Sequence, residues 1–210
     1  MRKFVAILLG IAMLTVNAAY ASENEKVKEI MISFESDFSA DSMGAVPSVG
    51  ISTPKSNKIT VEAEPGTANK WLKYENMGKE DMFYQFQVTQ AIDYFVCEFD
   101  INIEKFGNGN LLLCFKDTSN VEIELMHITK NGDLCAADNS VITPLVMGKT
   151  YKICAVLSLA DGKADVYVDH RKKASGISTS ADFNGISLFR FHLYQLAAGG
   201  STGVRRQNFL

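Results

Sequence analysis

The chain has 210 residues, 47% of them hydrophobic, and a formal net charge of −3. This length is sufficient for one domain with its own apolar core. The mildly acidic balance excludes nucleic acid as the expected partner, because such proteins carry a basic surface.

The N-terminus has the pattern of a secretory signal peptide. Arg2 and Lys3 are followed by a mostly apolar run at 4–16 and by the small-x-small sequence Ala-Tyr-Ala at 19–21. Cleavage after residue 21 would leave 189 residues with a formal charge of −5. The apolar run is too short for a comfortable membrane span. We therefore expect a secreted protein, extracellular or in the cell envelope, with no membrane span after cleavage.

Beyond a polar leader at 22–29, the sequence predicts a succession of short β-strands. Apolar and polar residues alternate in most of them, as is typical of strands with one buried face, and Gly, Pro and Asn mark the turns. The Arg171-Lys172-Lys173 run is interpreted as a solvated turn. The expected strands cover residues 30–34, 59–63, 71–74, 82–88, 94–106, 111–115, 121–128, 133–136, 151–159, 164–170 and 186–194.

The strongest local signal is a hairpin around Asp161-Gly162. Two alternating apolar runs flank this pair, and glycine tolerates the positive φ of a tight reversal. No window of comparable length has a helical period. The sequence therefore predicts an all-β fold, specifically a two-sheet antiparallel sandwich.

Several short motifs share their order with those of a known family. They are Glu35-x-Asp37-Phe38, Gly44-x-x-Pro47, Gly148-Lys149-x-Tyr151, Val166-Tyr167-Val168-Asp169, Phe183-x-Gly185-Ile186 and the long strand at 94–106. The chain thus resembles the concanavalin A-like (laminin G-like) jelly-roll modules of secreted bacterial proteins. The resemblance implies a jelly-roll sandwich over residues 30–196 and a function that involves glycans or cell surfaces.

The C-terminal stretch departs from this pattern. Such sandwiches usually close with a final strand beside the first, whereas residues 197–210 are glycine-rich and do not alternate. Either the module lacks its closing strand, or these residues form a disordered tail.

Four cysteines remain after export: Cys97, Cys114, Cys135 and Cys154. An even number in an oxidising compartment permits two disulfides in three pairings. Cys97 is also in phase with apolar neighbours, as a small core residue would be. The sequence is therefore compatible both with disulfides and with buried free thiols. No Cys-x-x-Cys metal spacing is present.

Two sets of residues are candidates for chemistry. Glu122 and Glu124 lie on one face of a strand, as paired carboxylates of a glycoside hydrolase would, but no third carboxylate follows them. For sugar binding, the candidates are an aromatic platform at Trp71 and a polar set on the last strand, provided that both lie on one concave sheet. That polar set consists of Arg190, His192 and Tyr194.

The candidate metal ligands are three histidines and one pair of carboxylates. His127, His170 and His192 have no metal-binding spacing, and Glu35 with Asp37 could contribute to a calcium site. No other cofactor is expected. The leading hypothesis is a secreted, non-catalytic module that binds carbohydrate or adheres to surfaces. The alternatives are a polysaccharide hydrolase or lyase, or a fragment of one, that uses Glu122 and Glu124, and a purely structural module.

Overall fold

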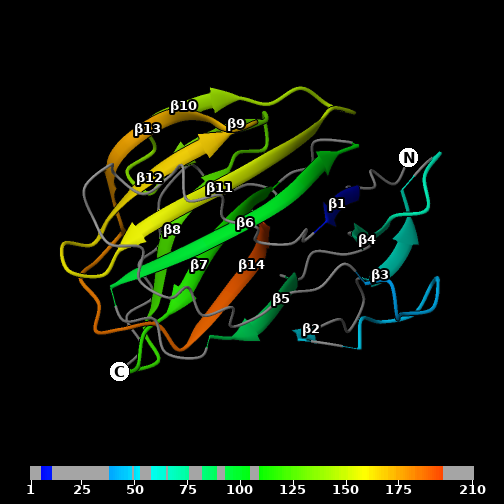
Figure 1. Cartoon of the computed structure of the whole chain (residues 1–210), viewed down its shortest axis with the longest axis horizontal. Coiled ribbons are helices and arrows are strands. Elements are labelled where there is room, and N and C mark those ends of the chain that lie inside the picture. The colour runs from blue at the N-terminus through cyan, green and yellow to red at the C-terminus, as the bar shows by residue number, and fades with distance from the viewer. Residues whose placement is uncertain are drawn as a thin grey trace.

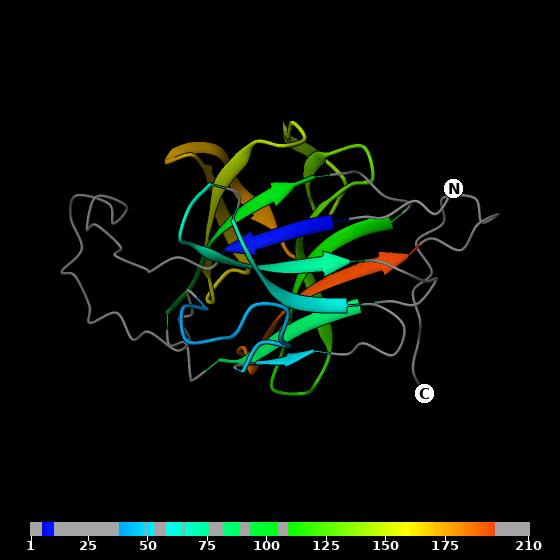
Figure 2. The same ribbon diagram turned by 90° about the vertical axis from the view of Figure 1, so that its right-hand side faces the viewer.

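A computed structural model describes residues 6–10, 38–48, 50–52, 58–64, 66–75, 82–88, 93–104 and 109–195. Every regular element in these ranges is a strand, and the strands form two antiparallel seven-stranded sheets. The two sheets stack as layers (Figures 1 and 2). The predicted all-β sandwich is confirmed.

The first sheet, here sheet A, has the long strand β6 at its centre. Its order is β13 (Arg171–Ser178), β12 (Lys163–Val168), β11 (Thr150–Ser158), β6 (Tyr94–Ile103), β1 (Ala6–Gly10), β4 (Lys70–Glu75) and β3 (Lys58–Ala63). β6 and β11 pair over nine consecutive residues, and the burial of β6 alternates along its whole length. This alternation fixes the register, because a slip of one residue would turn the apolar set to solvent.

The second sheet, sheet B, has β7 and β14 in its interior. Its order is β10 (Val141–Pro144), β9 (Asp133–Ala136), β8 (Glu122–Ile128), β7 (Gly109–Lys116), β14 (Leu188–Gln195), β5 (Met82–Gln87) and β2 (Ile51–Ser52). Because β14 pairs with both β7 and β5, the last strand of the described chain joins segments distant in sequence.

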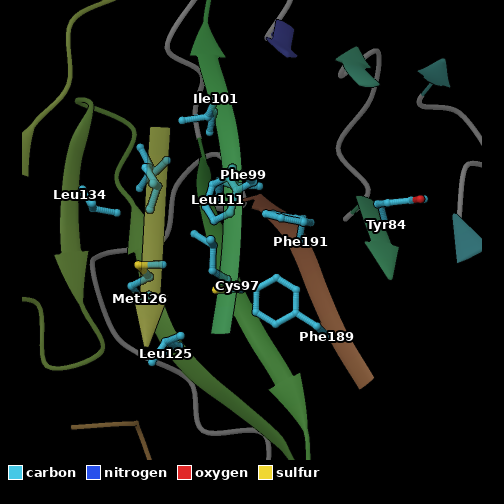
Figure 3. Close-up of a cluster of buried hydrophobic side chains, with 14 of the residues drawn as sticks. Tyr84, Cys97, Phe99, Ile101, Leu111, Leu125, Met126, Leu134, Phe189 and Phe191 are labelled. Atoms are coloured by element: carbon cyan, nitrogen blue, oxygen red, sulfur yellow. The ribbon is translucent and has the colours of Figure 1, made fainter. Parts of the chain in front are cut away.

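The inner faces of the two sheets meet in an aromatic core (Figure 3). Phe99 of β6 contacts Phe191 of β14 edge to face, with ring centroids 5.0 Å apart. Phe95 and Phe189 make a second contact between the same two strands at 5.4 Å. Each such ring contributes roughly 1.5–3 kcal/mol on full burial, so the layers are held together mainly by these in-phase apolar residues.

The expected hairpin is present, but the chain continues differently after it. β11 pairs with β12 around the Asp161-Gly162 turn, with Gly162 at φ 65°. Asp169 and His170 then make a second tight reversal at φ 50° and 62°. The Arg171-Lys172-Lys173 run is therefore not a turn but the start of the edge strand β13. This reversal could not be recognised from the sequence, because the turn contains no glycine. Asp and His are nevertheless among the residues that tolerate positive φ.

Part of the predicted signal peptide lies inside sheet A. Residues Ala6–Gly10 form β1, which pairs with β4 on one side and with β6 on the other (Figure 2). Cleavage after residue 21 stays a prediction, and it would remove this strand. The expected strand at 30–34 and the tail at 197–210 lie outside the described residues, so the two interpretations of the C-terminus stay open.

All four cysteines are free thiols in this structure. Cys97 and Cys154 lie on paired strands, but their side chains point to opposite faces of sheet A. Cys97 faces the core, whereas Cys154 pairs with Glu98, whose side chain faces outward. Cys114 and Cys135 are on β7 and β9, and β8 between them separates the two strands by about 9.6 Å. That spacing exceeds the Cα separation that a disulfide bridges.

Candidate binding face

The outer face of sheet B, the side turned away from the core, carries most of the predicted site residues. The strand registers align Gln85, Arg190, Cys114 and Glu124 in one row across β5, β14, β7 and β8. His192 lies in the next row, opposite Phe83. The outer-face positions of four strands thus form one continuous surface with mixed polar and aromatic character.

Arg190 is the centre of the contacts on this face. Its Nε and Nη2 donate hydrogen bonds to Gln85 Oε1 at 2.9 and 2.5 Å, and its Nη1 donates to Glu122 Oε2. The guanidinium carbon lies 4.3 Å from the centre of the Phe83 ring, in a cation–π geometry. The side chain of Arg190 is only 12% exposed, and its partners on β5 and β8 hold it in one orientation.

His192 and Tyr194 continue the surface along β14. His192 Nδ1 lies 3.3 Å from Glu122 Oε1, and the His192 ring meets Tyr194 edge to face at 6.1 Å. Tyr194 is 40% exposed. The predicted set of Arg190, His192 and Tyr194 therefore lies together, with its aromatic member open to solvent.

Glu122 connects β8 to this set and is held in its charged form. Burial raises its pKa, but a hydrogen bond with His192 and the charges of Arg190, His192 and Lys116 outweigh burial and lower the pKa overall. A carboxylate with a lowered pKa is a poor general acid at neutral pH.

Glu124 is on the same face as Glu122, as predicted, because the buried Ile123 lies between them. Its Oε1 is 2.6 Å from Nδ1 of His127, a side chain that is 5% exposed. The two carboxylates thus have separate partners: Glu122 contacts β14, and Glu124 contacts its own strand.

Trp71 lies elsewhere. It belongs to β4 in sheet A, so it does not share a sheet with Arg190, His192 and Tyr194, and the expected common platform is not formed. Only 4% of its surface is exposed, which leaves little area for stacking on a sugar.

The remaining candidates are not brought to this face. His170 lies in the reversal between β12 and β13 of sheet A. Glu35 and Asp37 lie outside the described residues, so the calcium site stays a prediction. In the loop at 38–48, Lys70 Nζ donates hydrogen bonds to the carbonyl oxygens of Ser39 and Asp41 at 2.7 and 2.5 Å.

Sequence reasoning missed Phe83 and Gln85. Both belong to the outward phase of β5. The alternation of β5 showed that phase, but nothing in the sequence indicated that β5 is the neighbour of β14. That pairing joins residues about 100 positions apart, and only the folded sheet shows it.

The fold and this face define a two-layer antiparallel β-sandwich with a polar and aromatic outer sheet surface. No family model and no curated protein sequence matches the chain. Among solved structures, a protein described as a sialidase has a TM-score of 0.54 and 17% identity, covering 80% of this chain. The alignment covers 15% of that sialidase chain.

A second solved structure is carbohydrate-binding module CBM66 from Bacillus subtilis. It has a TM-score of 0.40 and 17% identity, over 70% of this chain and 94% of that one. At these identities the comparison with the sialidase shows the β-sandwich fold and no more. Within the described residues, no helix is long and apolar enough to span a membrane.

Proposed function

We propose that this chain is a secreted, non-catalytic carbohydrate-binding module whose binding surface is the outer face of sheet B. The observation that carries the proposal is the preorganised Arg190 network, which Glu122 and His192 connect to the exposed ring of Tyr194. Sugar sites typically combine an aromatic surface for the apolar side of the ring with fixed polar groups for the hydroxyls.

The preorganisation supports binding in a specific way. Gln85, Glu122 and Phe83 already fix the guanidinium of Arg190, so little side-chain entropy remains to be lost when a ligand docks. The exposed ring of Tyr194 adds an amphipathic surface near the C-terminal end of the same strand.

A glycan array followed by calorimetric titration of the best ligand tests this proposal. We expect Tyr194→Ala and Arg190→Gln each to weaken binding about tenfold, which corresponds to about 1.4 kcal/mol. Tyr94→Ala is the matched control, because Tyr94 is a 54% exposed tyrosine on sheet A. Absence of any bound glycan, or binding that neither variant weakens, would refute the proposal.

The enzyme alternative rests on Glu122 and Glu124 sharing one face. Retaining hydrolysis needs a nucleophile and an acid whose carboxyl groups are about 5–5.5 Å apart. The lowered pKa of Glu122 suits a nucleophile, but the contact of Glu124 with His127 gives that carboxyl a structural partner. Polysaccharide turnover that both Glu122→Gln and Glu124→Gln abolish would favour this alternative. No turnover above background in the wild type would exclude it.

A further inference from the structure

Three side chains of kinds that bind transition metals converge on the outer face of sheet B. Cys114 from β7, Glu122 from β8 and His192 from β14 each place one ligand atom within 4.8 Å of the other two. We propose that this cluster is a binding site for a single Zn²⁺ ion. The site is additional to the proposed glycan-binding function and does not depend on it.

The donor set selects the metal. Zinc accepts thiolate sulfur, imidazole nitrogen and carboxylate oxygen together, at about 2.0–2.3 Å, whereas calcium and magnesium prefer oxygen ligands alone. In a tetrahedral site with these bond lengths the ligand atoms lie roughly 3.5 Å apart. Glu122 Oε1 and His192 Nδ1, at 3.3 Å, already have this spacing. Cys114 Sγ lies within 4.8 Å of both atoms, so a rotation of the Cys114 side chain would have to bring it to the same spacing.

The neighbours of Glu122 orient it for this role. Arg190 binds Oε2 and leaves Oε1 directed at His192, and Arg190 is itself fixed by Gln85. Hydrogen-bonding partners of this kind commonly hold metal-ligating carboxylates in position.

The charges also balance. A Cys114 thiolate and the Glu122 carboxylate would together neutralise the two charges of the ion, whereas Glu124 already contacts His127. Burial and the nearby carboxylates of Glu122 and Glu124 raise the pKa of the Cys114 thiol. Zinc binding therefore forms a Zn–S bond and releases the thiol proton to solvent.

Three protein ligands leave one position of a tetrahedral ion open. Cys114 is buried at the base of the cluster, whereas the Glu122 side chain is 33% exposed. The open position would therefore face solvent on the outer surface of the sheet, where water or a ligand oxygen can reach it.

Titration of the reduced, metal-free protein with Zn²⁺, followed by calorimetry, tests the site. We expect saturable binding of one ion per chain, and Co²⁺ loaded in its place should show a thiolate-to-cobalt charge-transfer absorption. Cys114→Ser and His192→Gln should each weaken zinc binding about tenfold or more. Cys154→Ser and His170→Gln are the matched controls and should bind like the wild type, because Cys154 lies in sheet A and His170 lies in the turn between two strands of that sheet.

Wild-type protein that binds no zinc, or a cobalt form without thiolate absorption, would overturn the proposal. So would unchanged affinity in Cys114→Ser or His192→Gln. Should Cys114→Ser fail to fold, His192→Gln and the wild-type cobalt spectrum still decide the question. Refutation of the zinc site would not affect the proposed glycan binding. That proposal is tested separately by the Tyr194→Ala and Arg190→Gln variants with the Tyr94→Ala control.

Discussion

Glu124 and His127 are three positions apart on β8, and yet their side chains meet at 2.6 Å on the same face. In a regular strand, residues three apart point to opposite faces. The register with β7 shifts between Leu113 and Cys114, so that Leu125 is an extra residue. This β-bulge returns His127 to the outer face, while Leu125 and Met126 both enter the core.

The Glu124–His127 contact should therefore stabilise the fold. We expect Glu124→Ala to lower the free energy of unfolding by about 1–3 kcal/mol, because it leaves the buried imidazole without this partner. Glu124→Gln keeps an oxygen acceptor and should cost less. Urea unfolding measures both, with Glu104→Ala as a control that should change stability by less than about 0.5 kcal/mol. Equal losses in Glu124→Ala and Glu104→Ala would contradict this role.

The lowered pKa of Glu122 predicts a pH-dependent contribution to stability. Its pKa in the folded protein lies below the ordinary 4.5, so the unfolded chain binds the proton more readily. The contribution is complete above about pH 4.5 and is lost as the pH falls through the folded-state pKa. It is modest because a third of the side chain is exposed to solvent screening.

This contribution is measured by comparing the wild type with Glu122→Gln. The advantage in unfolding free energy of the wild type should be constant from about pH 7 to about pH 5 and should shrink as the pH falls from about 5 to about 3. Glu104→Gln provides the control for replacing an exposed carboxylate. Stability curves of wild type and Glu122→Gln that stay parallel over this range would show that Glu122 carries no such linkage.

Gly50 is required for packing against Tyr84 as well as for its backbone angle. Its φ is 78°, and a Cβ atom there would lie 2.6 Å from the Tyr84 ring. Gly66 has nearly the same φ, 80°, but an added Cβ would meet nothing within 4 Å. The two glycines therefore separate the cost of the backbone angle from the cost of the contact.

We expect Gly66→Ala to destabilise the protein by about 1–2 kcal/mol, from the left-handed backbone alone. Gly50→Ala should add about 1–3 kcal/mol for overpacking against the buried Tyr84 ring. Thermal or urea unfolding of the two variants gives the difference. Equal losses of unfolding free energy in the two variants would mean that the backbone at Gly50 moves away from Tyr84 at no cost.

Removal of residues 1–21 should weaken sheet A where β1 lies. Cleavage would leave β4 and the Asp100–Ile103 part of β6 without the partner strand that β1 provides. We expect amide hydrogens of β4 to exchange faster in a chain that begins at Ser22 than in the full chain. The mass of the exported protein shows whether cleavage occurs. Unchanged protection of β4 would mean that another segment takes the place of β1.

The sequence alone determined the fold class and the faces of most strands. Period-two alternation fixes which side chains of a strand share a face, because it follows from local backbone geometry. It therefore predicted that Glu122 and Glu124 share one face of their strand, and that Arg190, His192 and Tyr194 share one face of theirs. It did not predict β1, which lies in the expected signal peptide, or β2, which is two residues long. It also missed β10 and β13, because both are edge strands without a fully buried residue, and their burial does not alternate.

Only the tertiary structure decided which strands are neighbours. Alternation carries no information on pairing between distant segments, and a single bulge reverses the face of every residue that follows it. The platform of Trp71 with Arg190, His192 and Tyr194 depended on both strands lying in one sheet, and it is not formed because β4 lies in the other sheet. Conversely, Gln85, Cys114 and Glu122 meet Arg190 and His192 only because β5, β7 and β8 assemble around β14.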